Sequence, residues 1–145
     1  MADLGARHAR VAGDVERRVL EVLRSGRYVG GPVVAEAERR LAATFGYAHV
    51  VGVNTGTDAL LYALMAMGIG PGHRVVVPAL TFFATAEAVI RVGAVPLVAD
   101  VRADLPLLDP AALPDGFDAV IAVHLFGERC DLPAVGPILD DVAQS

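Results

Sequence analysis

The turn Asn54-Thr55-Gly56-Thr57 has residue types that can bind a phosphate group. It stands between a β-branched run and a helix-like segment that begins at Asp58. The free N–H groups and the dipole at the start of such a helix attract an anion, and glycine leaves room for its oxygens. The turn lacks both the Walker G-K-[ST] and the dinucleotide G-x-G-x-x-G, which argues against triphosphates and dinucleotides. An ordinary strand-to-helix turn capped by threonine is the alternative.

Two carboxylates follow a short apolar run near the end of the sequence. Asp140 and Asp141 come directly after Ile138 and Leu139, so they are expected at the carboxyl end of a strand. Open α/β sheets bind ligands at that edge. A carboxylate there could accept a charged N–H from a ligand, more strongly in a low-dielectric setting. A solvated acidic end is the alternative.

Aromatic side chains and a histidine are expected at the same edge. Phe82 and Phe83 follow the strand-ending Pro78; one could stack on a planar ring, and we expect at least one of the pair to pack in the core. His124 follows the apolar run 119–123, either as a functional group or as a structural histidine. The four histidines lack metal-ligand spacing, and no Ser-His-Asp or Cys-His arrangement is apparent, so we expect no metal site.

Short β-branched runs alternate with helix-like segments after residue 49, which predicts an α/β fold with a mainly parallel sheet. The expected strands are 50–53, 74–77, 96–98, 118–123 and 138–140. The expected helices are 14–24, capped by Asp14 and ended by Gly26, then 32–45, 58–67 and 83–92. Segments 109–114 and 124–137 contain too much proline and glycine for a full helix. We therefore expect little helical cover on one face of the sheet.

Length and composition bound the class of protein. The 145 residues allow one ordinary domain at most. The apolar share is 54% and the charged share 20%, against about 45–50% and about 25% in typical domains. This excess of apolar residues predicts a subunit interface. All 12 basic residues are arginine, so these residues contain no lysine.

The same counts argue against several partners and compartments. A net charge of −5 without a Lys/Arg cluster argues against nucleic acid and against an anionic membrane surface. The apolar stretches are shorter than the roughly 20 residues of a membrane-spanning helix. The N-terminus has no apolar signal core and Cys130 is the single cysteine, so we expect a cytoplasmic protein without an intrachain disulfide.

Seven segments occur in an order that resembles a known family. They are S-G-R-Y-V-G-G-P at 25–32, F-G-Y-A-H-V-V-G-V-N-T-G-T-D-A-L at 45–60, G-I-G-P-G-H-R-V-V-V-P-A-L-T-F-F-A-T-A-E-A-V at 68–89, G-A-V-P-L-V-A-D-V at 93–101, L-D-P-A-A-L at 108–113, V-H-L-F-G at 123–127 and D-D-V-A-Q at 140–144. Together they resemble the DegT/DnrJ/StrS sugar aminotransferases, which are pyridoxal 5'-phosphate (PLP) enzymes of the aspartate-aminotransferase fold. The resemblance extends over nearly the whole chain from about Val15, and its specificity lies in the order of the motifs.

The resemblance implies a fold and a set of roles. The fold would be the N-terminal part of the aminotransferase large domain, with an arm at 1–13 and a partial PLP-binding domain at 14–145 that lacks the C-terminal part and the small domain. The implied cofactor-binding residues are Gly56, Thr57 and Asp58 for the phosphate, Phe82 for the ring face, Asp141 for the ring nitrogen and Gln144 for the ring hydroxyl. Asp141 would be the catalytic residue, because it keeps the ring nitrogen protonated. Tyr28, Gly30 and His124 would bind the substrate.

One departure from the family decides the functional expectation. The sequence ends before the family's S-x-x-K segment, which carries the Schiff-base lysine, and these residues contain no lysine. The chain could therefore not transaminate alone. The resemblance then implies a split enzyme, in which a complementary C-terminal aminotransferase polypeptide supplies the lysine in a heterodimer or a dimer of heterodimers. The substrate would be a nucleotide-linked ketosugar or a keto-cyclitol, with transamination or dehydration open.

Two alternatives to the split enzyme remain at this stage. A non-catalytic, degenerate subunit could stabilise or regulate a complete aminotransferase. The 145 residues could also be a bare fragment of a longer chain.

Overall fold

The computed structural model describes residues 3–133 and 135–144. The chain, expected from its length to form one domain at most, divides into two compact units, Met1–Gly52 and Val53–Ser145. Each unit is described by itself. The expected boundary between residues 13 and 14 stays a prediction.

The first unit consists of three helices, α1 (Leu4–Ala9), α2 (Ala12–Ser25) and α3 (Pro32–Phe45), and none of them has a buried residue. The predicted bounds of α3 are confirmed. Gly26 and Gly46 end α2 and α3 with φ of 66° and 72°, the left-handed conformation that glycine adopts without cost.

The predicted cap of α2 was wrong. The helix begins two residues before Asp14, and Val11 is its N-cap without a side-chain hydrogen bond. Asp14 instead lies in the first turn, where its carboxylate is 3.1 Å from the guanidinium of Arg17. An acidic residue is favourable anywhere in the first turn, because it complements the helix dipole. Residue type therefore predicted the end of the helix but not its first residue.

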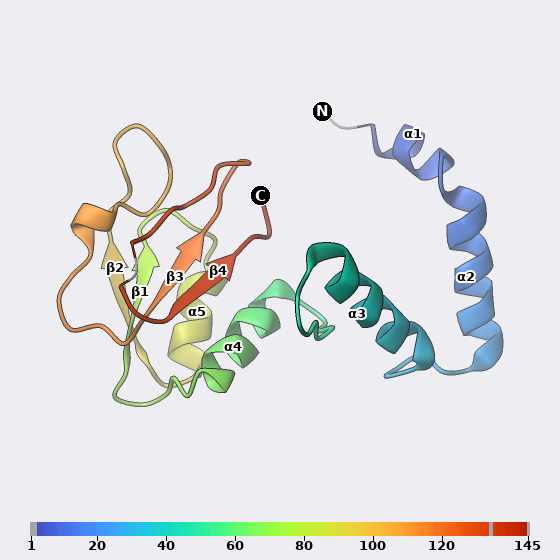
Figure 1. Cartoon of the computed structure of the whole chain (residues 1–145), viewed down its shortest axis with the longest axis horizontal. Coiled ribbons are helices and arrows are strands. Elements are labelled where there is room, and N and C mark those ends of the chain that lie inside the picture. The colour runs from blue at the N-terminus through green and yellow to red at the C-terminus, as the bar shows by residue number, and fades with distance from the viewer. Residues whose placement is uncertain (1–2, 134, 145) are drawn as a thin grey trace. The chain divides into compact units, whose positions relative to one another are not determined.

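The second unit contains a four-stranded, entirely parallel sheet (Figure 1). Its strands are β1 (Arg74–Pro78), β2 (Val95–Ala99), β3 (Ala119–Val123) and β4 (Ile138–Asp141), in the order β2-β1-β3-β4. Four predicted strands and the parallel arrangement are confirmed. The fifth, at 50–53, was wrong, because these residues pair with no strand in the part of the chain that is described. A β-branched run supplies only a local preference, whereas a strand needs a neighbour for its hydrogen bonds.

Helices cover one face of this sheet. Helices α4 (Gly56–Ala66) and α5 (Ala84–Arg91) pack against each other, and both contact the sheet, so they form one layer. Every residue of β3 is nevertheless buried, which requires cover on both faces. Residues of irregular segments complete the core, among them Leu107, Leu108 and Leu125. Between β2 and β4, the 3₁₀ turn Pro110–Ala112 is the one helical segment among the described residues. This confirms the expected scarcity of helical cover on one face of the sheet.

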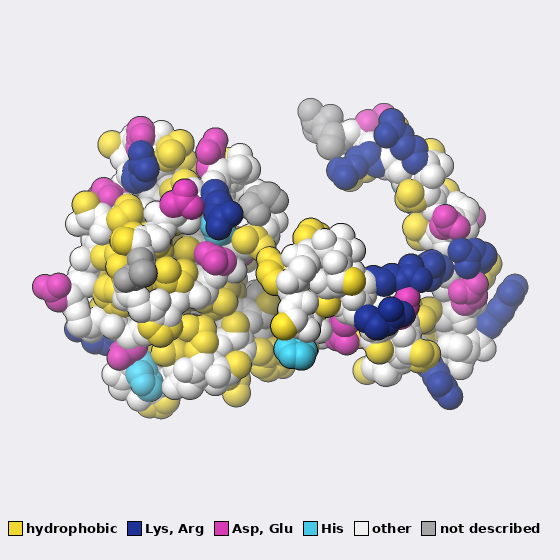
Figure 2. Space-filling view, viewed as in Figure 1, with side chains coloured by type: hydrophobic (Ala, Val, Ile, Leu, Met, Phe, Trp, Pro, Cys, Tyr) yellow, Lys and Arg dark blue, Asp and Glu magenta, His cyan; other side chains and the backbone are white. Residues whose placement is uncertain are grey.

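Charge is distributed unevenly along the chain. Most of the arginines lie in residues 1–52, and their side chains gather over the helices of the first unit (Figure 2). Within the described residues, no helix has the length and apolar character needed to cross a membrane.

Candidate functional site

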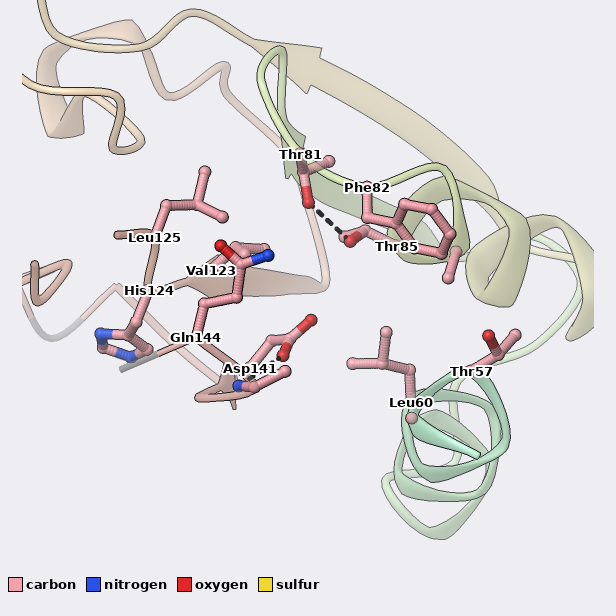
Figure 3. A pocket seen from close by; sticks show the side chains of 13 residues that line it. Thr57, Leu60, Thr81, Phe82, Thr85, Val123, His124, Leu125, Asp141 and Gln144 are labelled. Carbon is pink, nitrogen blue, oxygen red and sulfur yellow. Dashed lines mark hydrogen bonds between the residues drawn. The ribbon is translucent and has the colours of Figure 1, made fainter. Parts of the chain in front are cut away.

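A pocket lies in the second unit where β1, β3 and β4 reach their carboxyl ends (Figure 3). Parallel strands bring their carboxyl ends to one edge of a sheet, and the first turns of α4 and α5 lie at the same edge. The residues that line the pocket are Gly56, Thr57, Leu60, Thr81, Phe82, Ala84, Thr85, Val123, His124, Leu125, Asp141, Ala143 and Gln144. Six of the residues predicted from the sequence are among them: Gly56, Thr57, Phe82, His124, Asp141 and Gln144.

The start of α4 has the properties of an anion site. Thr55 is the N-cap, and its hydroxyl accepts a hydrogen bond from the Asp58 N–H at 3.0 Å. The amides of Gly56 and Thr57 have no acceptor among the described residues, so they can donate to a ligand. A Cβ built on Gly56 would meet no atom of the chain within 4 Å, so the space beside this amide is open. A phosphate group fits these donors and the positive end of the helix dipole.

Asp58 is placed differently from its neighbours. It does not line the pocket, and its Oδ1 lies 3.9 Å from Nη1 of Arg91 on α5. Its backbone N–H is already used by Thr55. The structure thus brings Gly56 and Thr57 to the pocket without Asp58, whose role in cofactor binding stays a prediction.

Asp141 ends β4, and its carboxylate is directed into the pocket (Figure 3). The side chain is partly buried, and Oδ1 accepts a hydrogen bond from the Ala143 N–H at 3.2 Å. No arginine lies within ion-pair distance of it among the described residues. The carboxylate can therefore accept a further N–H from a ligand, and it lines the same pocket as the free amides at the start of α4.

Phe82 presents its ring to the pocket and is 76% exposed. Phe83 is 70% exposed, so the expectation that at least one of the pair packs in the core was wrong. Both residues lie in the turn between β1 and α5, and Phe83 is the N-cap of α5. An exposed ring at a pocket is free to stack on a planar ligand.

Two threonines in the pocket were missed by the sequence analysis. The hydroxyls of Thr81 and Thr85 are 2.8 Å apart and form a hydrogen bond across the Phe82 turn (Figure 3). Thr85 is buried and Thr81 is partly buried. Their spacing of four residues around an aromatic pair, T-F-F-A-T, is the signal that could have identified them.

Gln144 and His124 line the pocket in different ways. The Gln144 side chain is exposed, and its backbone C=O accepts a hydrogen bond from the Gly127 N–H at 3.1 Å. The His124 ring is buried, and both ring nitrogens have partners: the Cys130 N–H donates to Nδ1 at 3.0 Å, and Nε2 lies 3.2 Å from Oδ1 of Asp140. This is the arrangement of a structural histidine, and the proposed contact of His124 with substrate stays a prediction.

Tyr28 and Gly30 belong to the first unit. The Tyr28 side chain is 65% exposed, and its hydroxyl donates a hydrogen bond to the Leu23 C=O at 3.2 Å. Gly30 has a φ of 59°, so it adopts the left-handed conformation that favours glycine. Their contact with substrate also stays a prediction.

A parallel sheet with a pocket at the carboxyl ends of its strands is typical of α/β ligand-binding proteins, and comparison with known proteins gives the family. The model of the DegT/DnrJ/EryC1/StrS aminotransferase family matches residues 10–143. The chain therefore belongs to this family.

Individual relatives agree with this assignment. The chain is 37% identical to the UDP-2-acetamido-2-deoxy-3-oxo-D-glucuronate aminotransferase of Pseudomonas aeruginosa, over 99% of this chain and 43% of that protein. It is similar to DesV of Streptomyces venezuelae, with a TM-score of 0.86 and 36% identity over 99% of this chain and 42% of that one. It is also similar to NtdA of Bacillus subtilis, solved with the bound cofactor PMP, with a TM-score of 0.77 and 31% identity over 83% of this chain and 28% of that one. The chain spans about 40% of the length of the curated relatives that it matches over almost its whole length.

Proposed function

We propose that residues 53–145 supply the phosphate- and ring-binding part of a PLP site in a sugar aminotransferase. The observation that carries the proposal is one pocket lined by the free amides of Gly56 and Thr57, the exposed ring of Phe82 and the carboxylate of Asp141. An anion site, a stacking surface and an N–H acceptor are the three groups that a phosphorylated pyridine needs. The membership of the chain in an aminotransferase family supports the same ligand.

Bound PLP supplies an electron-accepting ring, which stabilises negative charge on the substrate carbon that loses a proton. The residues of this chain bind and orient it. The amides of Gly56 and Thr57 donate to the phosphate, and Phe82 covers one face of the ring. The Asp141 carboxylate accepts the N–H of the ring nitrogen and so keeps a proton on that atom. The Gln144 side-chain amide donates to the ring hydroxyl.

The amine that holds the cofactor covalently comes, in this proposal, from polypeptide outside the 145 residues, because these contain no lysine. We propose a complementary C-terminal aminotransferase polypeptide as its source, in a heterodimer or a dimer of heterodimers. The proposed substrate is a nucleotide-linked ketosugar or a keto-cyclitol. The relative from P. aeruginosa, named for a UDP-linked oxo-sugar acid, supports the first of these substrates.

PLP binding to the chain tests the cofactor site. Asp141→Ala removes the N–H acceptor, so we expect at least about a tenfold loss of PLP affinity, which corresponds to about 1.4 kcal/mol. Asp131→Ala is the matched control, because the Asp131 side chain is 87% exposed and does not line the pocket. Equilibrium dialysis with PLP measures both affinities. Equal affinities in the wild-type chain and Asp141→Ala would contradict the proposal.

A non-catalytic, degenerate subunit of an aminotransferase is the second candidate. The two are separated by turnover of the assembly formed with a complementary aminotransferase polypeptide. If this chain holds the cofactor, Asp141→Ala abolishes turnover while assembly, measured by gel filtration, is unchanged. Unchanged turnover in the Asp141→Ala assembly would instead support a structural or regulatory subunit.

A further inference from the structure

We propose that Asp140 and His124 are positioning residues for the pocket. Their side-chain hydrogen bond holds the end of β4 so that the Asp141 carboxylate and Gln144 face the ligand. The inference rests on the proposed function only in taking this pocket as the cofactor site. Asp140 and His124 themselves would not touch the cofactor.

The two neighbouring carboxylates of β4 have different surroundings. Successive side chains of a strand point to opposite faces, so Asp140 is directed away from the face of Asp141. Asp140 pairs with Ala122 in the ladder, and Asp141 pairs with Val123. Oδ1 of Asp140 lies 3.2 Å from Nε2 of His124. The sheet thus gives one carboxylate to the pocket and the other to the histidine.

The hydrogen bonds of His124 place its proton. The Cys130 N–H donates to Nδ1 at 3.0 Å, so Nδ1 is an acceptor and carries no proton. The proton of the neutral ring is then on Nε2, which donates to Asp140. Burial raises the pKa of the Cys130 thiol, so this neighbour stays uncharged at neutral pH. The Asp140 carboxylate is thus the acceptor for the Nε2–H of the buried His124 ring.

The His124 ring also accepts a hydrogen bond that stabilises the turn at residues 125–130. Phe126 and Gly127 have consecutive positive φ angles of 56° and 85°, and the Phe126 side chain is 74% exposed, so packing does not hold it there. The turn is closed by the Glu128 N–H, which donates to the Leu125 C=O at 2.9 Å, and by the bond from Cys130 to the His124 ring. It delivers the Gly127 N–H to the Gln144 C=O.

Backbone and side-chain hydrogen bonds connect segment 124–127 to segment 140–144. In the backbone, the His124 N–H donates to the Asp141 C=O at 2.9 Å, and the Gly127 N–H donates to the Gln144 C=O at 3.1 Å. The side chains of His124 and Asp140 add a further hydrogen bond. Removing the Asp140 acceptor leaves the buried His124 N–H unsatisfied, which loosens the ring, the turn and the attached end of β4 together.

Amide hydrogen exchange of Asp140→Leu and Asp140→Asn tests this inference without a ligand. Asparagine keeps an Oδ1 acceptor for the His124 Nε2–H, whereas leucine removes it. The Asp140 side chain is 60% exposed, so neither substitution disturbs the core. In Asp140→Leu we expect about tenfold faster exchange at the amides of His124, Gly127 and Ala143, with Val76 in β1 unchanged. In Asp140→Asn all four rates stay near those of the wild-type chain.

PLP affinity and the circular dichroism of bound PLP provide the second readout. Asp140→Leu is expected to weaken PLP binding about tenfold and to reduce the induced signal, and Asp140→Asn to retain both. Asp140→Ala repeats the loss of the acceptor if the leucine variant does not fold. Unchanged exchange at the three amides, or equal acceleration over the whole sheet, would overturn the inference. A wild-type chain that does not bind PLP would contradict the proposed function, and the exchange rates would still decide the role of Asp140 and His124.

Discussion

At the scale of single residues, the pocket depends on the open space beside the Gly56 amide as well as on the side chains that line it. Gly56 has no atom of the chain within 4 Å of an added Cβ, although it is the first residue of α4, where other residue types are equally compatible with the helix. Nothing within the chain therefore requires glycine there. The close approach of the proposed phosphate to the amide would explain it.

Gly56→Ala tests this explanation. The added methyl group stands in the open space beside the amide, so we expect PLP affinity to fall at least about tenfold. The free energy of unfolding should stay equal or rise by less than about 1 kcal/mol, because alanine favours a helix over glycine. Gly13→Ala is the matched control, a helical glycine of α2 that also has no atom within 4 Å and lies outside the pocket. Urea denaturation and equilibrium dialysis measure the two quantities; unchanged PLP affinity in Gly56→Ala would contradict a phosphate at this amide.

At the scale of elements, the connection from α5 leads into β2, the edge strand that pairs with β1. The Gly93 N–H donates to the Ile90 C=O at 2.9 Å and the Ala94 N–H to the Val89 C=O at 3.1 Å, so the helix ends here with satisfied carbonyls. Gly93 has a φ of 83°, and a Cβ on it would lie 3.0 Å from Cγ of Pro71. The conformation favours glycine at this position, and Pro71 would have to shift to admit a Cβ.

Gly93→Ala is expected to lower the free energy of unfolding by about 2 kcal/mol or more. The left-handed conformation alone costs about 1–2 kcal/mol for a residue with a Cβ, and the contact with Pro71 adds to it. Gly72→Ala separates the two causes, because Gly72 has a φ of 90° but no atom within 4 Å. We expect a loss of about 1–2 kcal/mol there, from the conformation alone. Urea denaturation measures both variants, and equal losses would show that the Pro71 contact is relieved without cost.

At the scale of the whole molecule, the two units differ in how their elements are stabilised. Strands β1 and β3 belong to a continuous core, and every residue of β3 is buried. Helices α1, α2 and α3 have no buried residue and leave large apolar side chains exposed, such as Val19, Leu23 and Leu41. Helices of this length gain most of their stability from packing of an apolar face. The helices of the first unit therefore need cover that the described residues do not provide.

We expect this difference to appear in amide hydrogen exchange of the chain by itself. The amides of β1 and β3 should exchange at least about a hundredfold more slowly than those of α2 and α3, because opening the core requires unfolding of the second unit. Assembly with a complementary aminotransferase polypeptide should slow exchange in α2 and α3 and change β3 little. Equal protection of helices and strands in the chain alone would contradict the dependence on cover.

Residue types and local spacing by themselves predicted much of this protein. The glycine ends of α2 and α3, four of the strands and the ligand-binding edge followed from period, propensity and the rule that parallel strands end together. Five pocket residues were named for the same reason, since they end or follow a strand or begin a helix: Gly56, Thr57, Phe82, His124 and Asp141. Gln144 was named only from the resemblance to the family. These features depend on interactions within a few residues, which the order of residues specifies directly.

Contacts between distant segments were decided only by the tertiary structure. The run at 50–53 has the preference of a strand but no neighbour in the described chain, and Phe82 and Phe83 remain exposed because the turn between β1 and α5 keeps both rings out of the core. The partners of His124 come from Cys130 and from Asp140 on another strand, and the pairing of Val123 with Asp141 sets which carboxylate enters the pocket. A shift of one residue in that pairing would exchange Asp140 and Asp141, because side chains alternate along a strand. Register is a property of two strands together, so neither segment could specify it alone.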